Sequence, residues 1–210
     1  MEKACEKSLP IIIEELVTRP LGMTNSKFYF DASDNRLATA YANHHDHAEN
    51  VRKMLDSDAV IFFGPEIRYT PGRISNPHAY PSGGAGMAGT AADYLKFLEA
   101  IRNDGVGLNG VRILSADSVE LMTTDLVPDF EVGAAGPGFG FGMGFAVLRD
   151  SEKAGTPRKL GTFEWGGVYG NKMFVDPRSE LTVVILTNNA VYGLMNFPGL
   201  LTERIYQGLS

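Results

Sequence analysis

The sequence of 210 residues predicts a mixed α/β fold of the α+β type, in which helices flank an antiparallel sheet. Helical periodicity marks several segments, and the last third contains extended segments joined by short turns with no helix between them. The 44% content of hydrophobic residues, against 21% charged residues, is typical of a globular chain that buries a core.

The first helix is predicted over residues 2–17, where Leu9, Ile12 and Leu16 recur at helical spacing before an Arg-Pro pair ends the pattern. Between residues 21 and 81 the periodicity weakens, while Asp, Asn, His, Pro and Gly accumulate. We therefore expect a long excursion with little regular structure in this part of the chain.

Three more helices are predicted from their caps and apolar faces. Thr90 is a candidate N-cap with Asp93 three residues later, and this helix ends near Gly105, because glycine readily adopts the left-handed conformation. Ser115 caps a short second helix, and the apolar pattern of residues 193–209 predicts a closing helix that covers one face of the sheet.

The antiparallel sheet is predicted from extended segments in the last third of the chain, two of which are joined by a turn at residues 176–179. We accordingly divide the chain into residues 1–135, a portion of a helical subdomain with the irregular excursion, and residues 136–210, the sheet with the C-terminal helix. The extended segments are 138–148, 159–165, 172–175 and 181–186.

Charge and cysteine content exclude several classes of function. Nineteen basic against 25 acidic residues leave a formal charge of −6, which argues against nucleic acid as a partner. The single cysteine, Cys5, excludes an intramolecular disulfide framework. No apolar run is long enough to span a membrane, and no motif calls for a cofactor. As written, the sequence predicts a cytoplasmic protein.

Three of the four histidines lie within residues 44–47, where His45 and His47 have the spacing of strand ligands and Asp46 could join them. A metal-dependent hydrolase is one hypothesis for this cluster. A solvated loop that is rich in histidine explains it better, because no Glu or Cys in the run completes a usual ligand set. We therefore predict no metal site.

The sequence lacks the usual signatures of a serine nucleophile. It contains no G-x-S-x-G motif, and no serine is followed three residues later by a lysine that could serve as its base. The glycine-rich run 138–142 is read as a strand with little room on one face rather than a phosphate-binding loop. Trp165-Gly166-Gly167 permits either a ligand close to the backbone or a tight turn, and spacing alone does not decide between them.

Several segments, taken in order, resemble the serine β-lactamase-like hydrolases. The group contains class C β-lactamases, D-alanyl-D-alanine peptidases and esterases with a β-lactamase fold. The resemblance covers almost the whole chain and implies a partial β-lactamase/transpeptidase-like fold. The segments are 20–28 (PLGMTNSKF), 83–94 (GGAGMAGTAADY), 109–115 (NGVRILS), 140–145 (GFGMGF), 165–167 (WGG) and the strand-turn-strand of 174–188.

The resemblance also implies which part of the family fold is represented. In that family the S-x-x-K serine and the catalytic Y-x-N tyrosine lie upstream of the Pro-Leu-Gly-Met-Thr segment, which begins here at Pro20. The chain therefore looks like roughly the C-terminal half of one catalytic domain. Tyr41-Ala42-Asn43 spells Y-x-N, but it matches a non-catalytic stretch of the family. Any export signal would also lie upstream, so the location of a full-length parent stays open.

The remaining site residues are implied by the same resemblance. Trp165, Gly166 and Gly167 match the strand that lines the cleft, and the N–H of Val168 matches the second donor of the oxyanion hole. Tryptophan in place of the family's lysine removes a cation for a substrate carboxylate and favours neutral esters. The implied substrate-binding residues are Ser82, Gly84 and Ala85 beside the acyl pocket and Asn188 at the sheet-side end.

Two functions follow from these observations. In the first, the chain is the C-terminal portion of a serine hydrolase that acts on small ester or amide substrates through an acyl-serine, and it is inactive alone. It would then associate with itself or with a complementary N-terminal half to cover exposed apolar surface. In the alternative, it is a non-catalytic binding or interaction protein that retains the β-lactamase-like cleft.

Overall fold

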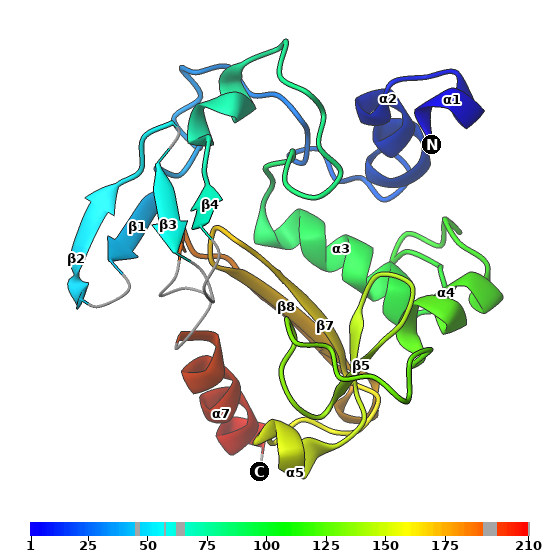
Figure 1. Cartoon of the computed structure of the whole chain (residues 1–210). Helices are drawn as coiled ribbons and strands as arrows, with labels where there is room; N and C mark the ends of the chain where they lie inside the picture. The colour runs from blue at the N-terminus through cyan, green and yellow to red at the C-terminus, as the bar shows by residue number, and fades with distance from the viewer. Residues whose placement is uncertain (45–46, 57, 62–65, 191–196, 210) are drawn as a thin grey trace. The chain divides into compact units, whose positions relative to one another are not determined.

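The computed structural model describes residues 1–44, 47–56, 58–61, 66–190 and 197–209 (Figure 1). Contacts between residues divide the chain into two compact units. Each unit draws on more than one stretch of the chain, and each is described separately below. The division at residue 135 stays a prediction. The first unit contains Met1–Tyr94, Gly167–Asn171 and Leu186–Phe197, and the second contains Leu95–Gly166, Lys172–Ile185 and Pro198–Ser210.

The N-terminal segment of the first unit is helical but interrupted. It contains the helices α1 (Glu2–Cys5) and α2 (Leu9–Ile13), followed by a π-helical turn, Glu14–Thr18. The prediction of one helix over residues 2–17 is wrong, because Glu6 takes a left-handed conformation with φ of 51° and the extended Ser8 caps a new helix.

Residues 21–81 are more regular than the sequence predicts. Here β1 (Tyr41–His44) pairs antiparallel with β2 (His47–Lys53) and parallel with β10 (Asn189–Ala190), and β3 (Ala59–Ile61) pairs with β4 (Glu66–Arg68). A short 3₁₀ helix, Pro71–Ser75, follows. The expectation of an irregular excursion is corrected here: β1 finds a partner, β10, far away in the sequence, which local periodicity cannot reveal. One buried cluster of this unit contains Ala42, Met54, Tyr69 and Ala190.

The two central helices form where their caps predict them. The Thr90 hydroxyl accepts the Asp93 N–H at 3.2 Å at the start of α3 (Ala91–Arg102), and Gly105 follows its end with φ of 86°. The Ser115 hydroxyl caps α4 (Ala116–Thr123) by accepting the Ser118 N–H. Both caps are confirmed.

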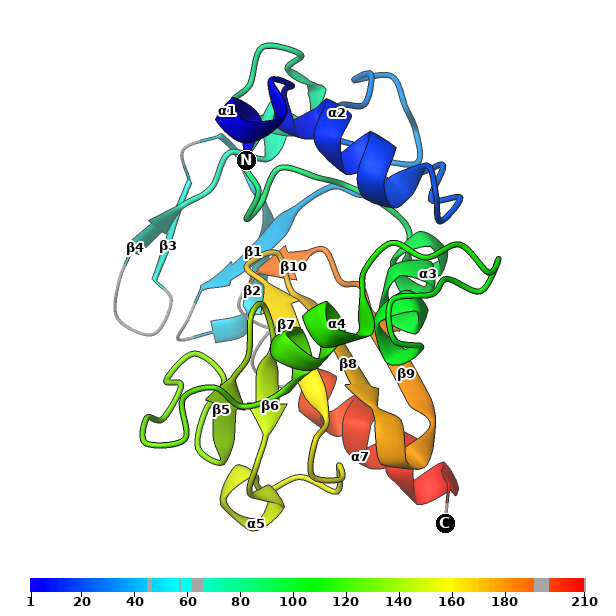
Figure 2. The same cartoon turned by 90° about the vertical axis from the view of Figure 1, so that its right-hand side faces the viewer.

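The second unit contains a five-stranded sheet in the order β5-β6-β7-β8-β9, which confirms the predicted fold class (Figure 2). The segment 138–148 is not one strand, because a turn over residues 142–145 divides it. The strands are β5 (Phe139–Phe141), β6 (Ala146–Leu148), β7 (Phe163–Gly167), β8 (Asn171–Asp176) and β9 (Leu181–Ile185), with α5 (Ser151–Ala154) and a 3₁₀ turn (Pro177–Ser179) in the connections.

Helices cover both faces of this sheet. Successive side chains along each strand point to opposite faces, so each face carries apolar residues. Phe163 and Val175 pack with Leu98 of α3, whereas Phe174, next to Val175, stacks on Tyr206 of α7 (Phe197–Leu209) at 6.5 Å between ring centroids. The closing helix is thus confirmed over residues 197–209, while residues 193–196 lie outside the described part. No described helix is long and apolar enough to cross a membrane.

Two glycines of the Gly-Phe-Gly-Phe-Gly run allow close backbone approach. A Cβ added to Gly140 would lie 2.0 Å from the Asp125 carboxylate, and one added to Gly142 would lie 2.2 Å from the Met122 carbonyl oxygen. Asp125 in turn accepts the N–H of Val127 and of Phe141. The interpretation of this run as a strand with little room on one face is therefore confirmed.

Gly140→Ala is expected to lower the free energy of unfolding by about 1–3 kcal/mol, because the added methyl group must displace the Asp125 carboxylate. Gly133→Ala is the matched control, since a Cβ at Gly133 meets nothing within 4 Å. Urea denaturation of both variants measures the difference. Equal stability of the two variants would contradict this account of Gly140.

Candidate active site

The turn between β7 and β8 is fixed by hydrogen bonds to its backbone carbonyls. The Gly170 N–H donates to Gly167 O at 2.9 Å, the Tyr69 hydroxyl donates to Val168 O at 3.0 Å, and the Thr187 hydroxyl donates to Gly170 O at 2.8 Å. Gly170 has φ of 94°, which closes the turn. Within the described residues, no acceptor for the Val168 N–H is recorded. All these groups belong to the first unit.

Tyr69 is the main support of this turn, and sequence reasoning missed it. Its side chain is buried, its backbone N–H donates to Asp58 O at 2.8 Å, and its ring meets Tyr169 edge to face with centroids 5.1 Å apart. Burial raises the pKa of Tyr69 to about 12, so the phenol remains a proton donor at neutral pH. Because the supporting contacts are distant in sequence, no local signal marks this residue.

Trp165 and Gly166 belong to the second unit, at the exposed end of β7. The strand is fully buried at Phe163 and Glu164 and becomes exposed from Trp165 onward. The indole of Trp165 packs edge to face on Phe141, with ring centroids 5.2 Å apart. The strand therefore presents a tryptophan of fixed orientation, about one third exposed, just before the two glycines.

The other predicted site residues lie in the first unit. Ser82, Gly84 and Ala85 occupy a largely exposed stretch of turns, and a Cβ at Gly84 would meet nothing within 4 Å. The Asn188 side chain donates to Thr39 O at 2.7 Å, and its backbone carbonyl accepts the Tyr41 N–H. The structure thus gives Asn188 a connecting role between β1 and β10, and the proposed contacts of these residues with substrate stay predictions.

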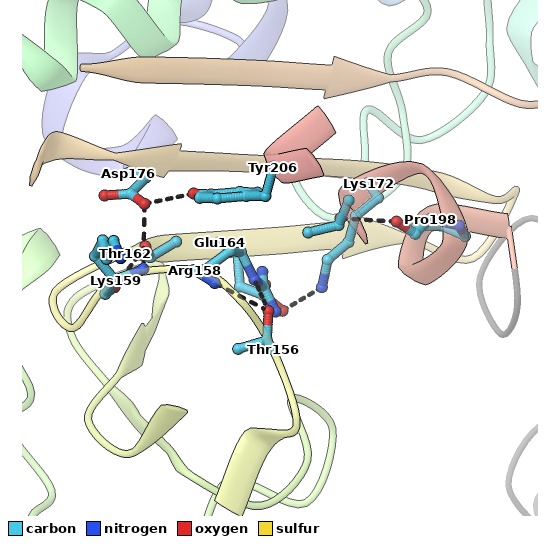
Figure 3. Close-up of polar contacts among 10 residues, drawn as sticks. Thr156, Arg158, Lys159, Thr162, Glu164, Lys172, Asp176, Pro198 and Tyr206 are labelled. Carbon is cyan, nitrogen blue, oxygen red and sulfur yellow. Dashed lines mark hydrogen bonds and ion pairs between the residues drawn. The ribbon is translucent and has the colours of Figure 1, made fainter. Parts of the chain in front are cut away.

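A buried ionic cluster in the second unit was also missed by the sequence analysis (Figure 3). The Glu164 carboxylate is buried and forms ion pairs with both Arg158 and Lys172. Burial, together with the positive charge of Arg158, lowers the pKa of Lys172 to about 7. A charged residue inside the otherwise apolar β7 was the available signal, since a buried carboxylate requires a partner.

Asp176 provides a second buried carboxylate at the end of β8. It accepts hydrogen bonds from the backbone N–H groups of Lys159, Arg178 and Ser179, at 3.1 Å each, and from the hydroxyls of Ser179 and Tyr206. Burial acts to raise the pKa of Asp176, but these hydrogen bonds lower it below the ordinary value of an aspartate. The predicted turn at residues 176–179 is confirmed, with Asp176 as its cap.

Metal binding finds no support among the residues that the structure describes, where no three His, Cys, Asp or Glu side chains converge. His45 and Asp46 of the predicted alternative lie outside these residues, and only the backbone of His44 and His47 is described.

Comparison with known proteins places most of the chain in one family. The model of the Beta-lactamase family matches residues 1–195, so the chain belongs to that family. Esterase EstB of Burkholderia gladioli is 39% identical over 92% of this chain and 47% of its own length. Protein Rv1367c of Mycobacterium tuberculosis is 35% identical, over 83% and 42% of the two chains.

Solved structures give the same fold. EstCE1, a hydrolase with promiscuous acyltransferase activity, is 38% identical, with a TM-score of 0.85 over 98% of this chain and 52% of its own. Simvastatin synthase LovD of Aspergillus terreus, as a mutant, shares the fold at 17% identity and a TM-score of 0.68, over 99% and 51% of the two chains. The chain thus spans about half the length of the relatives it matches.

Asp176→Asn is expected to reduce the pH dependence of stability. Because folding lowers the pKa of Asp176, its contribution is present above the unfolded pKa of about 3.9 and is lost as pH falls through the lower, folded pKa. At pH 7 the variant should lose about 2–3 kcal/mol of unfolding free energy, the scale of hydrogen bonds to a charged group.

The measurement is urea denaturation between pH 7 and pH 3, with the exposed Asp117→Asn as the control. The difference in unfolding free energy between the variant and the wild type should shrink as pH falls below about 3.9. If the difference between them does not change across this pH range, the buried carboxylate is not stabilised in its ionised form.

Proposed function

We propose that this chain provides the oxyanion-hole donor and a substrate-binding wall of a serine hydrolase that acts on neutral esters. The supporting observation is the Val168 N–H, which follows Trp-Gly-Gly in a turn whose three carbonyls at 167, 168 and 170 are all engaged by donors. A donor that is already oriented needs no rearrangement when negative charge develops on a tetrahedral intermediate.

The nucleophile of such a reaction must come from outside these 210 residues. No serine here is followed three residues later by lysine, which is the arrangement expected from the family resemblance. In the proposed complete enzyme, a serine from a complementary segment attacks the ester carbonyl, the alcohol leaves, and water then releases the acid. The Val168 N–H stabilises the oxyanion in both steps.

The choice of substrate class rests on Trp165. An indole cannot form the charge-assisted hydrogen bond that a lysine or arginine gives to a substrate carboxylate. Its packing against Phe141 instead provides an apolar surface beside the glycines. The 39% identity to an esterase supports ester over amide substrates, against 26% to a putative D-alanyl-D-alanine carboxypeptidase of Escherichia coli.

The proposal includes a partner, either a complementary half or a second copy of this chain. Several large apolar side chains are exposed in each unit, and a contiguous patch of such residues is the kind of surface that a partner covers. Ile11 and Leu16 belong to the first unit, and Leu121 and Met143 to the second. A light-scattering mass of a single 22.8 kDa chain without dye-accessible apolar surface would contradict this part.

The purified chain alone is expected to hydrolyse p-nitrophenyl butyrate no faster than the buffer, and a fluorophosphonate probe should not label it. Both results follow from the absence of a paired serine and lysine. Esterase EstB serves as the positive control. Stoichiometric labelling of the chain, located by mass spectrometry, would identify a nucleophile within it and overturn this prediction.

Val168→Pro tests the oxyanion donor in a reconstituted enzyme. The chain is co-expressed with the segment of esterase EstB that precedes its matched region. Proline removes the backbone N–H and should lower kcat by about 10²–10³-fold. Val168→Ala retains the N–H, so its kcat should stay near that of the wild type. Urea denaturation checks that both variants fold. Equal activity of Val168→Pro and Val168→Ala would contradict the assigned donor. Ester binding without turnover by the reconstituted protein would favour the non-catalytic alternative.

A further inference from the structure

The first unit contains a pocket with charged lining residues that the proposed hydrolysis does not use. Its volume is about 320 Å³, which lies at the lower end of the range for small-molecule sites. The lining comes from the segment before β3, from the end of β4, and from the 3₁₀ helix at residues 71–75 with the loop after it. The lining residues are Asp56, Thr70, Gly72, Arg73, Asn76 and Ala79.

Arg73 and Asn76 give the pocket a donor side. One terminal nitrogen of Arg73 donates to Tyr80 O at 2.6 Å, which fixes the guanidinium and leaves its other N–H groups available. The Asn76 side-chain oxygen accepts the His78 N–H at 2.9 Å, so the amide nitrogen of Asn76 is the group left to donate. A guanidinium beside an amide N–H suits a carboxylate.

Asp56 gives the pocket an acceptor side. One carboxylate oxygen accepts the Gly72 N–H at 2.7 Å, and the other lies 2.6 Å from where a Cβ of Gly72 would stand. Glycine at position 72 therefore lets the carboxylate sit directly against the helix backbone. The second oxygen of Asp56 is left to accept a hydrogen bond from an ammonium group.

The two charges share one pocket without neutralising each other. In the described part of the chain, no ion pair joins Arg73 or Asp56 to a residue of opposite charge, although other arginines of this unit are paired, such as Arg52 with Asp58 and Arg68 with Glu66. A ligand that carries both charges would complete both sides. A singly charged ligand would satisfy one side and leave the other charge unmatched.

We propose that this pocket binds a small zwitterion, with the carboxylate on Arg73 and Asn76 and the ammonium group on Asp56. A free α-amino acid is the simplest ligand of this class. The pocket lies in the same unit as the Val168 turn, and its lining residue Thr70 directly follows Tyr69, whose hydroxyl donates to Val168 O. Binding here requires no nucleophile and does not depend on the proposed ester hydrolysis.

The test is an NMR titration of the ¹⁵N-labelled chain with alanine, propionate and ethylamine. Alanine should shift the amide signals of Gly72, Arg73 and Asn76, with a Kd at least about tenfold below those of propionate and ethylamine, as expected when one charged contact is lost. Equal affinity for alanine and propionate, or no shift at these residues with alanine, would overturn the proposal.

Two variants preserve the local hydrogen bonds while removing one charge each. Arg73→Gln keeps an N–H donor for Tyr80 O, and Asp56→Asn keeps an acceptor for the Gly72 N–H. Each should weaken alanine binding about tenfold, and only Arg73→Gln should weaken propionate binding. Arg68→Gln, at an exposed arginine of β4, is the control and should bind alanine normally. A loss of binding in the control equal to that in Arg73→Gln would contradict a specific site.

Discussion

The strand register of the sheet in the second unit depends on two carboxylates that β7 and β8 bury on one face. Glu164 and Asp176 point to the side that carries α7, opposite the apolar residues that pack on α3. A buried carboxylate is costly unless it is paired, and here Arg158 and Lys172 serve Glu164 while backbone N–H groups and Tyr206 serve Asp176. This pairing fixes the register of β7, because a shift by one residue would place Glu164 in the apolar core.

Arg158 links the Glu164 carboxylate to aromatic rings on β5 and β8. Its guanidinium pairs with Glu164 and lies 5.4 Å from the ring centroids of both Phe139 and Phe174. Such contacts combine charge with apolar packing, which a lysine at this position would not reproduce. The Arg158 side chain is only 10% exposed, and this burial lowers its pKa to about 10. The loop before β7 is therefore held by ionic contacts as well as by the sheet.

The sequence predicts best those features that depend on neighbouring residues. The caps at Thr90 and Ser115 need only a side chain and an N–H three residues away, and both are confirmed. The parallel pairing of β1 with β10, and the contact of Tyr69 with Val168, join segments far apart in the chain and leave no local pattern. The site residues were assigned from family resemblance, since spacing alone left Trp-Gly-Gly open between a turn and a ligand site.

The structure confirms the tight turn at Trp-Gly-Gly, and the ligand site at the same residues stays a prediction. Gly167 does close a tight turn, as its bond from the Gly170 N–H shows, yet the turn leaves the adjacent Val168 N–H without a recorded acceptor. Engaging the carbonyl of Val168 with the Tyr69 hydroxyl fixes the orientation of the peptide plane that follows, while Thr187 fixes the end of the turn. A backbone donor can stabilise an anion only if its direction is set before the charge appears. In the proposed enzyme this tight turn would hold the Val168 N–H in place as the donor, so a turn and a ligand site at Trp-Gly-Gly are compatible.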